Sequence, residues 1–263
     1  MNSKGLSVVV IGSGNVAEAL ALRLSMSKGV ELRQVYARNK ERGQYIASLA
    51  GTAYTPSITA LATADIYLIA VSDSAVEEVA AALPLPATSL VAHTAGSVPL
   101  TSLPEHKGGR GVFYPLQSFS SGRSEAIEDA PIFIEGDSEE VYAKLNNLAR
   151  SMGLKSERAN SERRRRLHLA GVFVNNFVNH LYDIATDIVV EEGLNFEVLK
   201  PIIRETAAKA IASTDPRSVQ TGPARRGDRE VIERHLAMLR NEDTKKQIYN
   251  YLTKSIWETS KKM

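Results

Sequence analysis

The segment that decides the fold of this chain is Leu-Ser-Val-Val-Val-Ile-Gly-Ser-Gly-Asn-Val-Ala, residues 6–17. Its apolar run predicts a buried β-strand, and the two closely spaced glycines predict a tight turn into a helix. Gly12 allows the turn, Gly14 lets a pyrophosphate approach the backbone, and Ala17 lets the helix pack close to the sheet. Because a helix N-terminus attracts phosphate, we expect a dinucleotide here rather than a glycine turn without a ligand. The expected contacts are Gly12, Ser13, Gly14, Asn15 and Val16.

The sequence around this segment alternates strands with helices. Further strands are predicted at 31–36, 66–71, 89–93, 111–114 and 131–135, and helices at 15–27, 39–49, 74–83 and 138–152. This alternation predicts an α/β fold with a Rossmann-like, doubly wound parallel sheet. The later sequence predicts only helices, at 161–191, 196–213, 228–240 and 242–260. We therefore expect a dinucleotide-binding domain over 1–158 and an all-helical substrate and dimerisation domain over 159–263.

Composition excludes several classes of protein. The 263 residues are 43% hydrophobic, and 32 basic against 30 acidic residues give a net charge of +2, far below that of a dedicated nucleic-acid binder. The absence of cysteine excludes disulfides, iron–sulfur clusters and a thiol nucleophile. The five histidines lack metal-ligand spacing, so no metal site is expected. No apolar run approaches the ~20 residues of a membrane span. The N-terminus lacks the features of a signal or transit peptide, so we expect a cytoplasmic protein.

The end of the predicted strand 31–36 indicates which dinucleotide is bound. NAD enzymes usually carry an acidic residue near this point, for the ribose 2′-hydroxyl, but this chain has Arg38. A guanidinium suits a 2′-phosphate, which a carboxylate would repel. We therefore expect NADP (NADPH) as the cofactor; the alternative is a solvated arginine at the start of a helix.

Three more loops leave strands at the same edge of the sheet. The first carries Val71, Ser72 and Asp73, although Asp73 could equally cap the following helix. The second carries His93 and Thr94, and the third carries Gln117. Since the carboxyl ends of parallel strands border the ligand crevice, we expect Val71, Ser72, His93 and Thr94 at the cofactor and Gln117 at the substrate, unless these loops are turns alone.

Six motifs in order resemble a known family. They are Gly-Ser-Gly-Asn-Val-Ala, Ala-Val-Ser-Asp, His-Thr-Ala-Gly, Tyr-Pro-Leu-Gln-Ser-Phe, Leu-His-Leu-Ala-Gly-Val-Phe-Val-Asn-Asn-Phe and Thr-Gly-Pro-Ala-Arg-Arg-Gly-Asp. Nearly the whole chain resembles an uncharacterised bacterial family classed as NADP oxidoreductases, akin to pyrroline-5-carboxylate reductase, ketopantoate reductase and the β-hydroxyacid dehydrogenases. The resemblance implies a Rossmann-like domain, then a helical domain of unknown function similar to that of 6-phosphogluconate dehydrogenase, and a nicotinamide-dependent reductase.

The chain departs from these relatives at several positions. Ser72 and Ala95 replace a proline and a serine of the family pattern. The β-hydroxyacid dehydrogenases place a lysine one turn before an asparagine on the long helix, whereas this chain has Val172 before Asn176 and no lysine from 161 to 191. A lysine general acid is therefore absent from that helix, as it also is from pyrroline-type relatives.

The long predicted helix offers other polar groups for catalysis. At about 100° per residue, Asn175 and Asn179 each fall within about 20° of His168, and Asn176 lies about 80° away from it. The helix is apolar nearly all round and should be buried, so these groups need partners. We expect His168, with Asn176 or Asn175, to form a proton-donor site; a structural network or a dimer contact is the alternative.

Two basic segments could bind an anion. The run 163–166 opposes the helix dipole, so it suits an anionic partner as well as a solvated face. In the loop 221–228, capping of the next helix explains Asp228. It does not explain Arg225 and Arg226, which suit an anionic small-molecule substrate or a subunit contact.

Two functions follow from these features. The first is NADP-dependent reduction of a small carbonyl or imine acid; the alternative is a non-catalytic NADP-binding or sensing protein. The helices from residue 196 onward carry more apolar faces than a domain this small can bury. We therefore expect a homodimer, against a monomer whose last helix, with Trp257, closes its own bundle.

Overall fold

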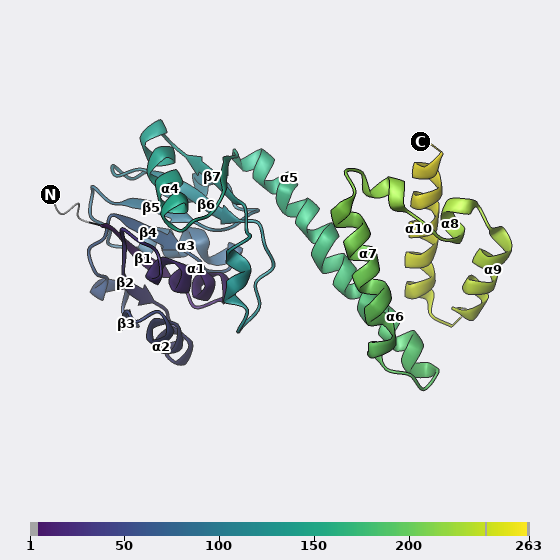
Figure 1. Cartoon of the computed structure of the whole chain (residues 1–263). Helices are drawn as coiled ribbons and strands as arrows, with labels where there is room; N and C mark the ends of the chain where they lie inside the picture. The colour runs from purple at the N-terminus through teal and green to yellow at the C-terminus, as the bar shows by residue number, and fades with distance from the viewer. Residues whose placement is uncertain (1–4, 240, 262–263) are drawn as a thin grey trace. The chain divides into compact units, whose positions relative to one another are not determined.

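The chain forms two compact units. The computed structural model describes residues 5–239 and 241–261 and divides the chain into residues 1–177 and 178–263 (Figure 1). The division lies within the long helical stretch, beyond the boundary at 158 that we expected from the change in sequence pattern.

The first unit is built on a single eight-stranded sheet in the order β3-β2-β1-β4-β5-β6-β7-β8. Its strands are β1 (Leu6–Ile11), β2 (Val30–Tyr36), β3 (Ala53–Thr55), β4 (Ile66–Ile69), β5 (Leu90–His93), β6 (Arg110–Pro115), β7 (Ile132–Gly136) and β8 (Ser156–Arg158). Every neighbouring pair is parallel except β6 and β7. The order 3-2-1-4-5-6 is that of the Rossmann fold, which confirms the predicted fold class.

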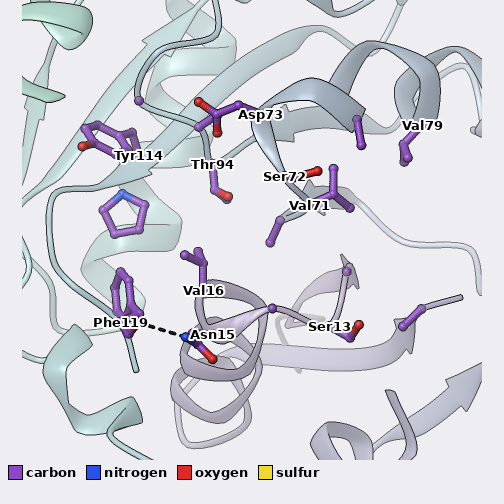
Figure 2. A pocket seen from close by; sticks show the side chains of 18 of the residues that line it. Ser13, Asn15, Val16, Val71, Ser72, Asp73, Val79, Thr94, Tyr114 and Phe119 are labelled. Carbon is purple, nitrogen blue, oxygen red and sulfur yellow. Dashed lines mark hydrogen bonds between the residues drawn. The ribbon is translucent and has the colours of Figure 1, made fainter. Parts of the chain in front are cut away.

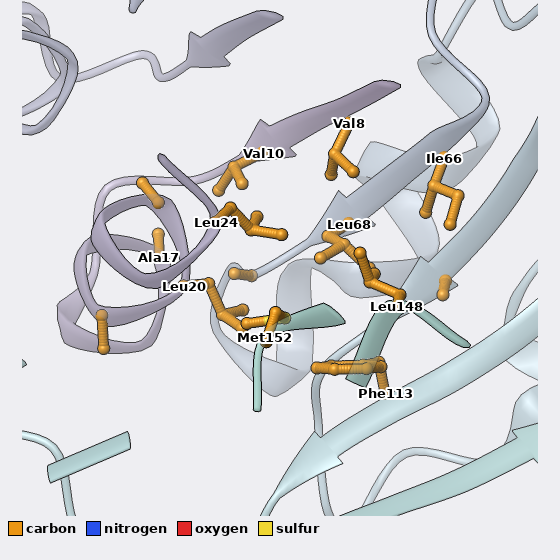
Figure 3. Close-up of a cluster of buried hydrophobic side chains, with 14 of the residues drawn as sticks. Val8, Val10, Ala17, Leu20, Leu24, Ile66, Leu68, Phe113, Leu148 and Met152 are labelled. Carbon is orange, nitrogen blue, oxygen red and sulfur yellow. The ribbon is translucent and has the colours of Figure 1, made fainter. Parts of the chain in front are cut away.

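Helices cover both faces of this sheet. They are α1 (Asn15–Ser25), α2 (Lys40–Leu49), α3 (Val76–Ala82) and α4 (Glu139–Ser151), with short 3₁₀ turns at Ile58–Ala60, Asp73–Ala75, Leu100–Ser102 and Ser124–Ile127. Successive side chains of β1 alternate between two cores: Val8 and Val10 pack with Leu20 and Leu148 of α1 and α4 (Figure 3), and Val9 packs on the α3 side. This period of two is why a buried parallel strand appears as an uninterrupted apolar run.

Three features of the sheet differ from the sequence prediction. The edge strands β3 and β8 were not predicted, because three residues are too few to show a period. The pair β6–β7 is antiparallel, although we predicted a parallel sheet. Between these strands the chain forms only the short turn Ser124–Ile127. A parallel return requires a long crossover, usually a helix, so the chain returns antiparallel.

The long helical stretch is continuous but not a regular α-helix. It comprises α5 (Ser161–Gly171), a π-helical turn η5 (Val172–Phe177) and α6 (Val178–Glu191). The expectation that it is buried is wrong for the single chain, since Phe173 and Val174 are 59% and 75% exposed. A helix that is apolar on all sides is expected to be packed against other residues on all sides. The described residues of this chain do not bury these side chains.

The second unit contains helices only among its described residues. After α6 follow η6 (Phe196–Leu199), α7 (Lys200–Ala212), η7 (Pro216–Val219), α8 (Pro223–Arg226), α9 (Arg229–Met238) and α10 (Asp243–Ser260). Ala224 alone among the described residues after 177 is buried. No described helix of the chain is both long and apolar enough to cross a bilayer.

Candidate functional site

A cavity of the first unit lies at the carboxyl ends of the strands, where the strand order reverses between β1 and β4. Its volume is about 720 Å³. Loops after β1, β2, β4, β5 and β6 line it, and Figure 2 shows their side chains. A crevice at this topological switch point is where open α/β sheets bind their ligands.

The two glycines after β1 meet different requirements. Gly12 has φ = 132°, and a Cβ built on it would lie 2.2 Å from the carbonyl oxygen of Ala70, so the fold itself requires glycine there. Gly14 has φ = −76°, and a Cβ on it would have no heavy atom of the described chain within 4 Å. Gly14 borders the cavity, so the space that a Cβ would fill suits the pyrophosphate of a dinucleotide.

The first turn of α1 forms the floor of the cavity. The N-cap of α1 is Gly14, which has no side chain to accept a hydrogen bond from the first turn. The first N–H groups of α1 are therefore available to phosphate oxygens. The side chain of Asn15 is held by a hydrogen bond from Nδ2 to the carbonyl oxygen of Phe119, 3.0 Å away (Figure 2). Ser13 and Val16 also line the cavity, so all five residues of the predicted phosphate loop lie together.

The loop after β2 brings Arg38 to the cavity. Arg38 is exposed and lines it together with Asn39, whose side chain caps α2 by accepting from the Arg42 N–H at 2.9 Å. The Arg42 guanidinium is paired with the buried carboxylate of Glu18. Arg38 is thus the guanidinium that this loop presents to the cavity.

The loops after β4 and β5 supply the opposite wall. Val71, Ser72 and Thr94 line the cavity as expected, as do Asp73 and Gly96. Asp73 does not cap α3: its carboxylate accepts a hydrogen bond from the hydroxyl of Ser97, which ties the two loops together.

His93 lies beneath this wall. It is fully buried and is not among the cavity-lining residues. Its Nδ1 accepts the Ala95 N–H at 3.2 Å, and its Nε2 meets no hydrogen-bond partner among the described residues. Burial, assisted by the nearby Arg164, lowers the pKa of His93 to about 4. The geometry therefore makes His93 a support of the 94–96 loop and gives it no direct contact with the cavity.

A second cavity of about 390 Å³ adjoins the first. Both cavities are lined by Tyr114, Gln117 and His168. These three side chains form a shared wall where the two cavities adjoin. Asn175 and Asn176 both line the second cavity, although a regular helix would separate them by about 100°. The π-helical turn Val172–Phe177 contains both, and such turns occur often at functional sites.

Tyr114 and His168 contact each other at the wall between the cavities. The Tyr114 hydroxyl lies 3.3 Å from Nδ1 of His168. Burial of the phenol, with the Asp73 carboxylate nearby, raises the pKa of Tyr114 to about 12 against the opposing effect of Arg164. Tyr114 was not among the expected site residues, although its motif was. The sequence did offer one indication of this role: Tyr114 is the last aromatic residue of a strand that ends at the crevice.

Arg164 anchors the helix that carries His168. It is fully buried, pairs with the Glu135 carboxylate, and donates to the carbonyl oxygens of Ala95, at 3.3 Å, and Val98. The expectation of a solvated or ligand-binding basic run is therefore wrong at Arg164. Nothing in the sequence distinguishes it from its three arginine neighbours, because only the packing of α5 on the β5 loop selects one of them.

Arg225 and Arg226 belong to the second unit. The Arg225 guanidinium donates to the carbonyl oxygens of Ser218, at 3.3 Å, and Gln220, so it stabilises its own loop. Arg226 is exposed. Asp228 caps α9 by accepting from the Val231 N–H at 3.2 Å, as predicted.

Two family models match the chain. Residues 7–96 match the NADP oxidoreductase, coenzyme F420-dependent family, and residues 130–256 match a domain of unknown function, DUF2520. No curated protein matches the chain.

Solved structures are similar over nearly the full length. A Bacteroides fragilis protein provisionally named an NADP oxidoreductase is 37% identical, with a TM-score of 0.88 over 97% of this chain and 99% of that chain. A Thermotoga maritima protein is 20% identical, with a TM-score of 0.75 over 97% and 98%. The NADP-bound pyrroline carboxylate reductase of Plasmodium falciparum is 16% identical, with a TM-score of 0.63 over 98% of both chains, and shares the fold. The chain therefore belongs to the family of NADP oxidoreductases in which a Rossmann-type domain precedes a helical domain of unknown function.

Proposed function

We propose that this protein reduces a small carbonyl or imine acid with NADPH. The observation that carries the proposal is the wall shared by the two cavities, formed by Tyr114, Gln117 and His168. One cavity has the glycine loop and the arginine of an NADP site. The other opens beside it and has room for a small molecule, with amide groups on its lining. Substrate and cofactor bound side by side would therefore react at the shared wall.

The roles of the chain's own residues follow from this arrangement. NADPH, when bound, supplies a hydride to the carbonyl or imine carbon. His168 supplies the proton that the substrate oxygen or nitrogen must gain as the carbon is reduced. Asn175, Asn176 and Gln117 donate and accept hydrogen bonds that orient the substrate in the second cavity. The cofactor's phosphates bind at the first turn of α1, and Arg38 binds its 2′-phosphate.

We propose that the arginines of the 221–228 loop bind an acidic group of the substrate. Arg226 is the stronger candidate, because the Arg225 guanidinium already donates to two carbonyl oxygens of its own loop. Replacing Arg226 by alanine should raise KM for the acid at least tenfold and leave NADPH affinity unchanged. An unchanged KM would remove Arg226 from the substrate site.

Cofactor choice is tested by Arg38→Asp. The substitution replaces the partner of the 2′-phosphate by a repelling carboxylate, so NADPH affinity should fall at least tenfold, about 1.4 kcal/mol. NADH affinity should change less or improve. Fluorescence titration with both dinucleotides measures the two constants. Lys40→Asp, at an exposed residue that does not line the cavity, is the matched control for the change of charge. Equal losses for NADPH and NADH in Arg38→Asp would contradict the assignment.

Turnover is tested by NADPH oxidation with a panel of keto and imino acids. Steady oxidation with one class of acid, abolished by loss of His168, supports the reductase. Tight NADPH binding without turnover across a broad panel would instead favour a non-catalytic NADP-binding or sensing protein.

We also propose that the protein is a homodimer through its helices. Ala224 is the single buried residue among those described after 177, while Ile202, Ile211 and Tyr251 are 63%, 85% and 74% exposed. A helical unit without an interior of its own cannot gain enough from apolar burial to offset the entropy of ordering its chain. A second copy related by twofold symmetry supplies the cover.

A further inference from the structure

Tyr114 and His168 form a hydrogen-bonded pair at the shared wall. The two side chains come from different elements, β6 and α5, and contact through one polar atom each, 3.3 Å apart. Their rings meet edge to face, with centroids 6.3 Å apart at an interplanar angle of 64°. This geometry holds the phenol oxygen against the imidazole nitrogen in a fixed orientation.

The surroundings keep the two groups in contact. Gly96 lies directly against both: a Cβ on it would be 2.7 Å from Cζ of Tyr114 and 2.9 Å from Nδ1 of His168. Arg164, one helical turn before His168, anchors α5 to the loop that carries Gly96. A side chain at position 96 would therefore separate the phenol from the imidazole.

The two members differ in their access to solvent. Tyr114 is 8% exposed and packs with Val112 and Phe133, whereas His168 is exposed. His168 can therefore exchange protons with water, and Tyr114 presents its hydroxyl from a buried position. Because most of the phenol is buried, a hydrogen-bond donor aimed from it at a developing charge stabilises that charge more strongly than it would in water.

We propose that Tyr114 is a catalytic residue that passes a proton from His168 to the substrate. As the substrate carbon gains the hydride, the Tyr114 O–H bond breaks and its proton forms the new O–H or N–H bond of the product. The proton on Nδ1 of the His168 imidazolium moves to the phenol oxygen, which restores the hydroxyl and leaves His168 neutral. His168 then takes up one proton from the solvent, so the net reaction consumes one hydride and one solvent proton. The substrate is reduced by two electrons, and Tyr114 carries no net charge at the end of the transfer.

The electrostatics of the site suit a transfer in which both protons move together. Burial and the Asp73 carboxylate raise the pKa of Tyr114 to about 12, with Arg164 opposing them, so a lone tyrosinate is unfavourable. Simultaneous protonation by His168 avoids that charge. The charged and titratable groups around the pair are Asp73 from the β4 loop, His93 from β5 and Arg164 from α5.

The test combines kinetics with a measurement that needs no substrate. In the protein without cofactor, ¹⁵N NMR of the His168 imidazole should show a hydrogen-bonded Nδ1 that changes in Tyr114→Phe and in Gly96→Ala. Tyr142→Phe, which removes a half-buried phenol outside both cavities, should leave it unchanged. An identical Nδ1 resonance in wild type and Tyr114→Phe would overturn the pairing.

With an acid that the wild type reduces, Tyr114→Phe and His168→Asn should each lower kcat about 100-fold, the range of one general acid. The double variant should lose no more than the worse single variant, because the two act as one unit. NADPH affinity should stay within about twofold in all three variants, because neither side chain belongs to the first turn of α1 or to Arg38, which we propose bind the cofactor's phosphates.

The proposed relay rests on the proposed reductase, and different results would contradict each of them. A wild type that oxidises NADPH while Tyr114→Phe keeps its full kcat, or losses that multiply in the double variant, would overturn the relay and leave the reductase standing. A wild type that turns over no acid in the panel would overturn the reductase and the relay with it, even where NMR finds the pair intact.

Discussion

Gly12 and Gly14 are the same residue type two positions apart, yet glycine is needed at each for a different reason. Gly12 has a backbone conformation that L side chains rarely adopt, and the Ala70 carbonyl leaves no room for a Cβ. Gly14 has an ordinary conformation and open space, so only a ligand would require glycine there.

Alanine substitutions separate these two requirements. Gly12→Ala should lower the free energy of unfolding by more than ~1 kcal/mol, because alanine is strained at positive φ and also meets the Ala70 carbonyl. Gly14→Ala should leave stability within ~0.5 kcal/mol of the wild type, as for a substitution away from packed features, and should weaken NADPH binding at least tenfold. Thermal unfolding and NADPH titration measure both. A Gly14→Ala protein that binds NADPH normally would show that the open space is not the pyrophosphate site.

His93 predicts a pH dependence of stability. Its pKa falls from 6.5 unfolded to about 4 folded, so between these values the unfolded chain binds the extra proton. The contribution of neutral His93 to the free energy of unfolding should therefore be complete above pH 6.5. It should fall by about 1.4 kcal/mol per pH unit as the pH drops toward 4.

Urea titrations of wild type and His93→Asn between pH 4 and 7 check this dependence. Asparagine can accept the Ala95 N–H but cannot titrate, so the variant should lose this part of the slope. Carboxylates titrate equally in both proteins and cancel in the difference. Parallel pH profiles would show that His93 does not carry the effect.

At the scale of elements, α5 is joined to the β5 loop and to β7 through Arg164. Ser161 assists by donating to the Glu135 carboxylate at 2.8 Å and accepting the Leu100 N–H at 3.1 Å. These bonds fix the start of the helix, and with it the position of His168.

Arg164→Met should therefore be costly. It leaves Glu135 and two loop carbonyls without their guanidinium, and breaking a buried ion pair typically costs about 3–5 kcal/mol. The matched control is Arg163→Met, whose exposed pair with Glu157 should contribute less than ~1 kcal/mol. Chemical denaturation of both variants gives the comparison. Equal, small losses would mean that the Arg164 pair does not anchor the helix.

At the scale of the whole molecule, Trp257 packs against its own chain. A Cβ on Gly227 would lie 2.9 Å from the Trp257 ring, and Lys261 Nζ lies 4.6 Å from the ring centroid. The other exposed apolar residues of the helices are the ones that we propose a second copy covers.

Light scattering at micromolar concentration should therefore give a mass near twice the 28.7 kDa of one chain. Ile202→Glu and Ile211→Glu should shift it toward the monomer, because each places a charge on an apolar face of α7. Met26→Glu, at a residue of the first unit that is 68% exposed, is the control and should not. A wild-type mass near 28.7 kDa that persists on concentrating would reject the dimer.

The Rossmann sheet was predictable from sequence because its determinants are local. The run Leu6–Ile11 forms one strand that is buried from Ser7 onward, and Gly12 signals a backbone conformation that other residues avoid. The caps Asn39 and Asp228 bond to N–H groups three residues away, so they too were predictable. The short strands β3 and β8 were not, since pairing with a neighbour rather than a pattern of their own makes them strands.

The amino-acid sequence by itself determined the fold class, the glycine turn after β1, the position of Arg38 after β2 and the helical second half. Each depends on spacing or residue type within a few positions. Only the tertiary structure decided that His93 lies beneath the cavity, that Arg164 is buried among exposed arginines, and that Tyr114 meets His168. Tyr114 and His168 are 54 positions apart and Arg164 and Ala95 are 69 apart, so their contacts arise only when β5, β6 and α5 pack together. Side chains that look alike in the local sequence thus acquire different roles, because packing of the elements decides which residues they contact.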